Sequence, residues 1–177
     1  MPQISHATSA TTPGGQSVLT VVLFVIYAVL LVGVVLFKFP FQYQLTDSGR
    51  HLNLIPFAGS FENSRLGIGE VAENALIFVP FGIYISMLAN RWSVGVRIAV
   101  IAGSSVVFEA IQFAFAIGRS DITDVLGNTL GGLVGIGLYA LSARILKHRT
   151  KSVLTIVELV VTVIALAFFT FLRLHSK

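Results

Sequence analysis

The sequence predicts an all-α membrane protein, a polytopic bundle of about five transmembrane helices. Hydrophobic residues make up 55% of the 177 residues and charged residues only 11%, whereas a soluble domain carries about 25% charged residues. Five apolar runs are long enough to cross a bilayer core of about 30 Å, which takes roughly 20 helical residues. These runs lack the alternating pattern of a membrane barrel, so helices are the remaining way to satisfy the backbone in lipid.

The expected helices follow one another with short connections, except for one long loop. The apolar runs cover residues 18–37, 71–89, 94–117, 122–146 and 153–172. Gly118 is expected to end the third helix, and a tight turn at 118–121 then makes the third and fourth helices antiparallel neighbours. The chain thus divides into a polar, disordered tail (1–17), a membrane core (18–146) with an outer loop (38–70), and a basic inner loop with an additional C-terminal transmembrane helix (147–177).

Basic residues set the expected orientation, because cytoplasmic loops of membrane proteins are enriched in Lys and Arg. The dense groups lie at Arg91, Arg97, Arg144, Lys147, Arg149 and Lys151. We therefore expect these loops and the N-terminus in the cytoplasm and the C-terminus outside. The absence of cysteine excludes disulfide and thiolate chemistry. The sequence has no basic stripe with interleaved aromatic residues, so it does not indicate nucleic-acid binding. The histidines lack metal-ligand spacing.

Polar side chains collect near the predicted outer surface. They are Asn74 on the second helix, Glu109 and Gln112 on the third, and Asp121, Asp124 and Asn128 at the start of the fourth. A rise of 1.5 Å per residue puts Glu109 roughly 12 Å below the outer end of its helix. Carboxylates within a span are costly and are functional candidates by default. We expect an outward-facing polar pocket, with Glu109 and Asp124 as the candidates for any catalytic role.

Each of these groups also has a structural interpretation. Asp121 and Asp124 occupy N-cap and N3 positions, where a carboxylate stabilises a helix start. Asn74 and Gln112 are suited to hydrogen bonds between helices. The glycines 127, 131 and 135 are spaced for close helix packing, either inside the bundle or between protomers of an oligomer. Glu158, alone on the fifth helix, is expected to reach the inner surface or to pair with the basic loop.

Four motifs together resemble the VanZ-like family of bacterial membrane proteins. They are RHLNLIPF at 50–57, ENALIFVPFG at 73–82, FEAIQ at 108–112 and GRSDITDVLGNTLGG at 118–132. The family pattern falls on Arg50, Asn53, Pro56, Phe57, Asn74, Pro80, Gly82, Glu109, Gln112, Arg119, Asp121, Asp124, Asn128 and Gly131. The resemblance, which covers about residues 50–139, implies the inner (cytoplasmic) membrane of a bacterium and a cell-envelope context. The family takes its name from a protein associated with low-level resistance to the glycopeptide teicoplanin, and the resemblance implies no reaction.

Two classes of function fit these residues, and we favour binding without catalysis or a cofactor. In this hypothesis the ligand is an anionic lipid or a lipid-linked envelope precursor, because guanidinium groups match phosphate; the partners are membrane lipids, a cell-wall precursor or a glycopeptide. The ligand-binding set is Arg50, Asn53, Asn74, Glu109, Gln112, Arg119, Asp121, Asp124 and Asn128. The alternative is a membrane-embedded hydrolase or transferase acting on a polyprenyl (pyro)phosphate, with Glu109, Asp121 and Asp124 holding Mg²⁺ or Mn²⁺. Proton-coupled transport through Glu109 is a weaker third possibility, since no internal repeat is visible.

Overall fold

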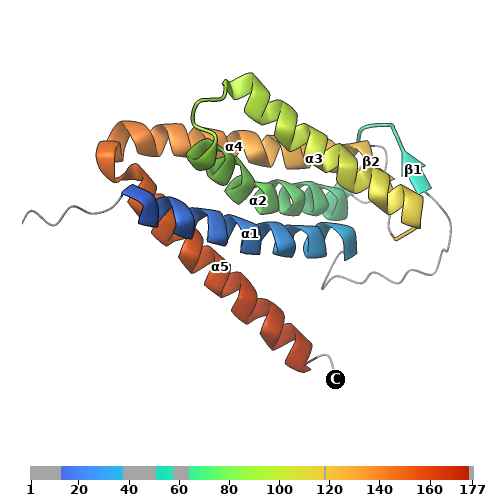
Figure 1. The fold of residues 1–177 in the computed structure, drawn as a ribbon. Coiled ribbons are helices and arrows are strands. Elements are labelled where there is room, and N and C mark those ends of the chain that lie inside the picture. Colours follow the sequence, from blue (N-terminus) through green and yellow to red (C-terminus); the bar gives the residue numbers. More distant parts are fainter. Residues whose placement is uncertain (1–12, 38–50, 58–63, 118, 176–177) are drawn as a thin grey trace, which may run out of the picture.

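The computed structural model describes residues 13–37, 51–57, 64–117 and 119–175 of the chain. Its elements are α1 (Pro13–Phe37), β1 (His51–Asn53), α2 (Ser64–Leu88), α3 (Val94–Phe115), β2 (Arg119–Asp121), α4 (Ile122–Leu146), the short 3₁₀ helix η1 (Lys147–Arg149) and α5 (Thr150–His175). The two strands lie together at one end of the helix bundle, and the η1 turn lies at the opposite end (Figure 1).

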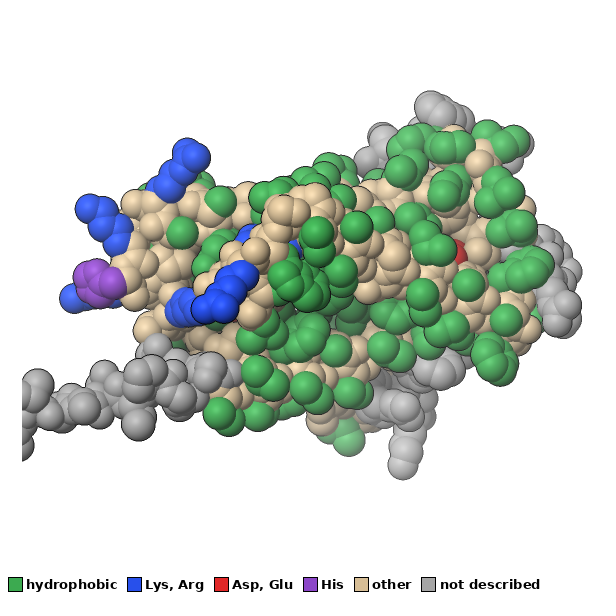
Figure 2. All heavy atoms as spheres, turned by 45° about the horizontal axis from the view of Figure 1, so that its top comes forward, with side chains coloured by type: hydrophobic (Ala, Val, Ile, Leu, Met, Phe, Trp, Pro, Cys, Tyr) green, Lys and Arg blue, Asp and Glu red, His purple; other side chains and the backbone are tan. Residues whose placement is uncertain are grey.

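Length and composition make this chain a multi-pass membrane protein, which confirms the predicted fold class. Within the described residues, four helical segments are long and apolar enough to cross a membrane: Val18–Leu36, Gly69–Leu88, Val94–Phe115 and Ile122–Phe171. The last segment has 50 residues, and the chain reverses direction at η1 to divide it into α4 and α5 (Figure 1). Apolar side chains cover much of the molecular surface (Figure 2), as expected for helices that face lipid.

The observed helix ends differ from the predicted ones at several places. The helix α4 has the predicted bounds, whereas α1 begins at Pro13, so residues 13–17 belong to a helix and not to the expected disordered tail. The tail residues 1–12 lie outside the described part of the chain. The helix α2 begins at Ser64, inside the expected outer loop, and α5 begins at Thr150.

The end of α3 is set by Ala116 and not by Gly118, as the sequence had predicted. Ala116 has a left-handed backbone with φ 51° and ψ 39°. The N–H of Ile117 donates to the carbonyl of Gln112 at 3.1 Å, and that of Ala116 donates to the carbonyl of Phe113 at 3.4 Å. This is the Schellman pattern of helix termination, here with alanine in the position that glycine most often takes. Gly118 itself lies outside the described residues.

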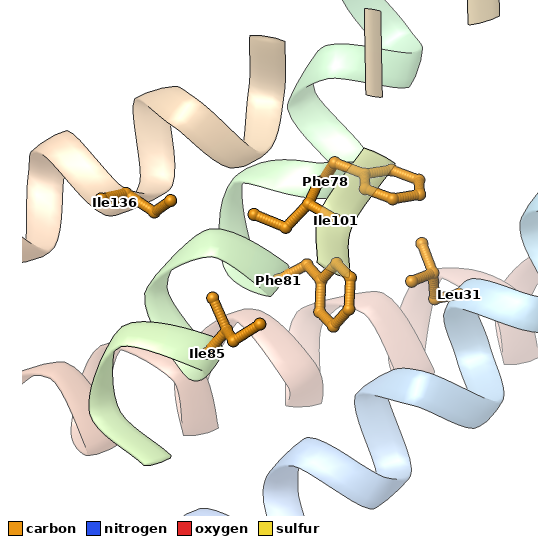
Figure 3. Close-up of a cluster of buried hydrophobic side chains, with 6 residues drawn as sticks. All are labelled: Leu31, Phe78, Phe81, Ile85, Ile101 and Ile136. Atoms are coloured by element: carbon orange, nitrogen blue, oxygen red, sulfur yellow. The ribbon is translucent and has the colours of Figure 1, made fainter. Parts of the chain in front are cut away.

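The helix α2 is central to the bundle. It contributes Phe78, Phe81 and Ile85 to a buried apolar cluster that also contains one residue each from α1, α3 and α4, namely Leu31, Ile101 and Ile136 (Figure 3). The rings of Phe78 and Phe81 meet edge to face with centroids 5.9 Å apart, a favourable aromatic geometry. Four helices are thereby held around one core.

Glycines of α4 allow it to lie directly against α2. A Cβ atom on Gly131 would collide with the carbonyl oxygen of Ala75, and one on Gly135 would collide with that of Val79. A Cβ atom on Gly127 would lie 3.2 Å from the carbonyl oxygen of Val71. The contact points advance by four residues in the same direction on both helices, so α2 and α4 run parallel. The predicted helix-packing role of these glycines is confirmed, and the partner is α2 of the same chain.

Candidate functional site

A short parallel strand pair closes the end of the bundle where α3 ends and α4 begins. In its register His51 pairs with Arg119, Leu52 with Ser120, and Asn53 with Asp121. The sequence had predicted only a tight turn at 118–121, and the structure corrects this: residues 119–121 form β2, which pairs with the chain that precedes α2.

Asp121 joins β1, α3 and α4 at this end. Its backbone N–H donates to Oε2 of Glu109 at 2.8 Å, and its side-chain Oδ1 accepts from the N–H of Thr123 at 2.8 Å. Its Oδ2 accepts from Nδ2 of Asn53 at 2.9 Å. The N-cap role predicted for Asp121 is therefore confirmed, and its carboxylate also complements the positive end of the α4 dipole.

Two asparagines connect α4 to its neighbouring helices. Nδ2 of Asn74 on α2 donates to Oδ1 of Asp124 at 2.6 Å, and Nδ2 of Asn128 donates to Oγ of Ser105 on α3 at 2.7 Å. Asn128 is only 1% exposed, and its Oδ1 has no hydrogen-bond partner among the described residues. Polar groups from three helices thus converge as the sequence predicted.

We call this set the outer polar site, after the side of the membrane that the sequence predicts for it. Its members are Asn53, Asn74, Ser105, Glu109, Asp121, Thr123, Asp124 and Asn128. Ser105 and Thr123 are not among the residues predicted from the sequence. Ser105 precedes Glu109 by four residues, one helical turn, so this spacing was the signal that could have found it. Thr123 carried no such signal, because its partner comes from a distant loop.

An apolar segment follows β1 and is anchored beside the outer polar site. The N–H of Phe57 donates to Oγ1 of Thr123 at 3.0 Å, and the N–H of Ile55 donates to Oδ1 of Asn53 at 3.1 Å. Phe57 has φ 62°, a left-handed conformation that is uncommon for a bulky residue. Leu54, Ile55 and Phe57 nevertheless leave much of their side chains exposed. Polar and apolar surfaces therefore adjoin at this end.

Gln112 does not belong to the outer polar site, contrary to the sequence prediction. Its Nε2 donates to the backbone carbonyl of Val35 on α1 at 2.7 Å, and the side chain is buried. Gln112 therefore links α3 to α1, which is the structural role considered from the sequence.

The side chains of the two arginines predicted to bind phosphate lie outside the described part of the structure. Arg119 is the first residue of β2 and pairs in register with His51. Arg50 directly precedes His51 in the sequence and lies outside the described residues, as does the side chain of Arg119. The strand pairing thus links the two sequence stretches that carry these arginines.

The carboxylates of the site do not form a metal-ligand set. The described part of the chain contains no group of three His, Cys, Asp or Glu side chains arranged to hold a metal ion. Glu109 bonds a backbone amide, Asp121 caps α4, and Asp124 bonds Asn74. Among the described residues the three acids thus join segments of the protein.

Comparison with known proteins decides the family. The family model of VanZ/LLP1 matches residues 24–146. The chain belongs to the VanZ/LLP1 family. A relative, Protein VanZ of Enterococcus faecium, is 36% identical over 158 residues, which cover 86% of this chain and 94% of the relative. No solved structure matches the chain.

The resemblance inferred from four motifs is thereby confirmed, and the matched region extends beyond residues 50–139 on both sides. All members of the outer polar site lie within the part that the VanZ/LLP1 model covers. The Arg50–His51 stretch, the apolar segment 54–57 and β2 lie within it as well. The helix α5, in contrast, begins after the end of this match.

Proposed function

We propose that this VanZ-family protein binds an anionic lipid or a lipid-linked envelope precursor at the outer polar site. The observation that carries the proposal is the parallel pairing of β1 with β2, which sets Arg119 against His51, the residue after Arg50. Guanidinium groups bind phosphate oxygens in a bidentate manner. Arg119 on β2, together with Arg50 next to β1 in the sequence, would suit a phosphate or pyrophosphate headgroup.

The neighbouring apolar segment favours an amphipathic ligand over a free anion. Leu54, Ile55 and Phe57 are exposed next to the strand that carries Asn53. In the proposed complex the headgroup contacts the arginines, and the first part of the hydrocarbon chain contacts this segment. Apolar contact contributes roughly 25 cal/mol per Å² of buried surface, so even a short stretch of chain adds substantial affinity.

The acidic residues have a supporting role in this proposal. Carboxylates repel a phosphate, so Glu109, Asp121 and Asp124, which each accept a hydrogen bond from a neutral donor of the protein, are assigned no contact with the headgroup. They hold β2 and the start of α4 in place, so that Arg119 is presented from a fixed backbone. We therefore assign ligand contact to Arg50 and Arg119, and positioning to the acids and to Asn53, Asn74 and Asn128.

The proposed orientation places this site at the outer face of the bacterial inner membrane. Lys and Arg side chains gather at the end of the bundle that carries η1, opposite the strand pair (Figure 2). Positively charged loops are retained in the cytoplasm, so the N-terminus is cytoplasmic and the C-terminus is outside. An outer binding site accords with the association of the family with teicoplanin resistance, since cell-wall precursors and a glycopeptide would both be accessible there.

Photo-crosslinking tests the proposal. The purified protein is placed in nanodiscs containing photoactivatable phosphatidylglycerol or photoactivatable polyprenyl phosphate, and the labelled peptides are identified by mass spectrometry. We expect labelling near 50–57 and 119–124, with a loss of several-fold in Arg119→Ala and Arg50→Ala. Lys151→Ala, at the opposite end of the bundle, is the matched control and should label normally. Equal labelling of all variants would contradict the assignment of phosphate binding to the arginines.

A further inference from the structure

A second buried polar cluster lies deeper in the bundle, between α5, α1 and α2. It contains Glu158 of α5, which is 2% exposed, and Tyr84 of α2, which is 0% exposed. The sequence predicts that Glu158 reaches the inner surface or pairs with basic residues, and its burial in the structure corrects this. Tyr84 follows Asn74 by ten residues on α2, about 15 Å along the helix axis, so the cluster is distinct from the outer polar site.

Tyrosines from two neighbouring helices lie near the Glu158 carboxyl. Tyr27 of α1 and Tyr84 both interact electrostatically with Glu158, and their rings are 5.4 Å apart. Thr162 lies one turn further along α5 and is close to the Tyr84 hydroxyl. Thr20 and Thr155 share a hydrogen bond of 3.1 Å between α1 and α5, next to this group.

Two hydroxyl groups of this cluster already donate hydrogen bonds to backbone carbonyls. The hydroxyl of Tyr27 donates to the carbonyl of Ile77 at 2.9 Å, and that of Thr162 donates to the carbonyl of Glu158 at 2.7 Å. The Tyr84 hydroxyl is buried without a hydrogen bond of good geometry among the described residues, although Thr162 and Glu158 lie near it. The Thr162 and Tyr84 oxygens near Glu158 each have a lone pair that can accept a hydrogen bond or coordinate a cation.

The charge on Glu158 has no visible compensation within the described residues. Glu158 lies roughly 12 Å along α5 from Thr150, on the η1 side of the helix midpoint. The titratable groups near it are Tyr27 from α1 and Tyr84 from α2, while Tyr139 of α4 packs against the apolar cluster that contains Leu154. On α5 itself, Lys151 is exposed and about 10 Å away along the axis. Intramembrane carboxylates are costly and normally have a partner.

We propose that Glu158, Tyr84 and Thr162 form a binding site for one charge-neutralising monovalent cation, either a proton or Na⁺. A proton makes Glu158 a donor to the Tyr84 or Thr162 oxygen. A sodium ion instead binds the carboxylate together with the same hydroxyl oxygens. Both occupants supply the positive charge that the surrounding helices lack, and both strengthen the contact of α5 with α1 and α2.

Carbodiimide labelling tests this site in the full-length protein. Dicyclohexylcarbodiimide adds to a protonated carboxyl: an oxygen of the acid bonds to the central carbon, the proton moves to nitrogen, and acyl migration leaves a stable N-acylurea. We expect a single adduct that peptide mass spectrometry places on Glu158, that Glu158→Gln removes, and that Glu70→Gln, a control at an exposed position, retains.

The two occupants are distinguished by the conditions that suppress labelling. A proton site loses labelling as the pH rises, with no effect of Na⁺ at fixed pH, whereas a sodium site is protected by Na⁺ and not by K⁺. Tyr84→Phe, which keeps the ring and removes one oxygen, should shift the pH or Na⁺ concentration for half-labelling. Absence of labelling at Glu158, or labelling that responds to neither pH nor Na⁺ while the far-UV circular dichroism is unchanged, would overturn the proposal.

Discussion

The carboxylate of Glu109 accepts a hydrogen bond of 2.8 Å from the backbone N–H of Asp121. This contact connects the last turns of α3 to the residue that ends β2 and caps α4. A buried carboxylate that bonds a main-chain amide fixes the path of the backbone and leaves that amide satisfied. Glu109 is therefore first a positioning residue for the strand pair.

Replacement of Glu109 should lower the free energy of unfolding, and the loss should be larger when no acceptor remains for the Asp121 N–H. Glu109→Gln keeps an acceptor oxygen and should cost about 1 kcal/mol in the free energy of unfolding, whereas Glu109→Ala leaves the Asp121 amide unpaired and should cost about 2–3 kcal/mol. Thermal unfolding of the purified variants in one detergent measures the difference. Glu73→Ala, at an exposed position, is the control, and equal stability of all three variants would refute the positioning role.

The close approach of α4 to α2 predicts a sharp contrast between two glycines of α4. A methyl group at Gly131 meets the Ala75 carbonyl, whereas a methyl group at Gly137 meets nothing within 4 Å. Gly131→Ala should therefore destabilise the fold by more than about 2 kcal/mol. Gly137→Ala should be neutral or stabilising by up to about 1 kcal/mol, because alanine is the better helix former. Fluorescence-detected size-exclusion chromatography after heating ranks the variants, and similar melting temperatures would show that the helices are not in contact there.

The contact between Asn74 and Asp124 should appear as coupling between α2 and α4. Nδ2 of Asn74 lies 2.6 Å from Oδ1 of Asp124, and hydrogen bonds between membrane helices contribute about 0.6–2 kcal/mol. A double-mutant cycle of Asn74→Ala and Asp124→Ala, read by reversible unfolding in mixed micelles, should give a coupling energy in this range. Strict additivity of the two changes would mean that the side chains do not interact.

Much of the fold follows from local features of the sequence, which explains what could be predicted. The bounds of α4 follow from a capping residue, Asp121, placed directly before an apolar run. The convergence of polar groups from α3 and α4 follows from helical spacing and from the short connection between these helices. Such signals act within one element or between chain neighbours, so the sequence displays them.

The features that were missed depend on which distant segments meet. Pairing of Asn53 with Asp121 joins two strands of three residues each, too short for a periodic pattern. The direction in which Gln112 and Glu158 point depends on which helix packs beside each one, and hydropathy does not encode this. Ala116 ended α3 because the main-chain hydrogen bonds of the last turn closed around it, even though a glycine stood nearby.

The central claim is that the strand pair forms the outer end of the protein and gathers the residues proposed to bind the ligand. Disulfide crosslinking of Leu52→Cys with Ser120→Cys tests it most directly, since these residues are register partners and the chain has no cysteine of its own. In intact cells a membrane-impermeant oxidant should crosslink this pair, and it should not crosslink Leu52→Cys with Trp92→Cys. Crosslinking only after permeabilisation would contradict the outer location, and no crosslink even then would contradict the strand pair itself.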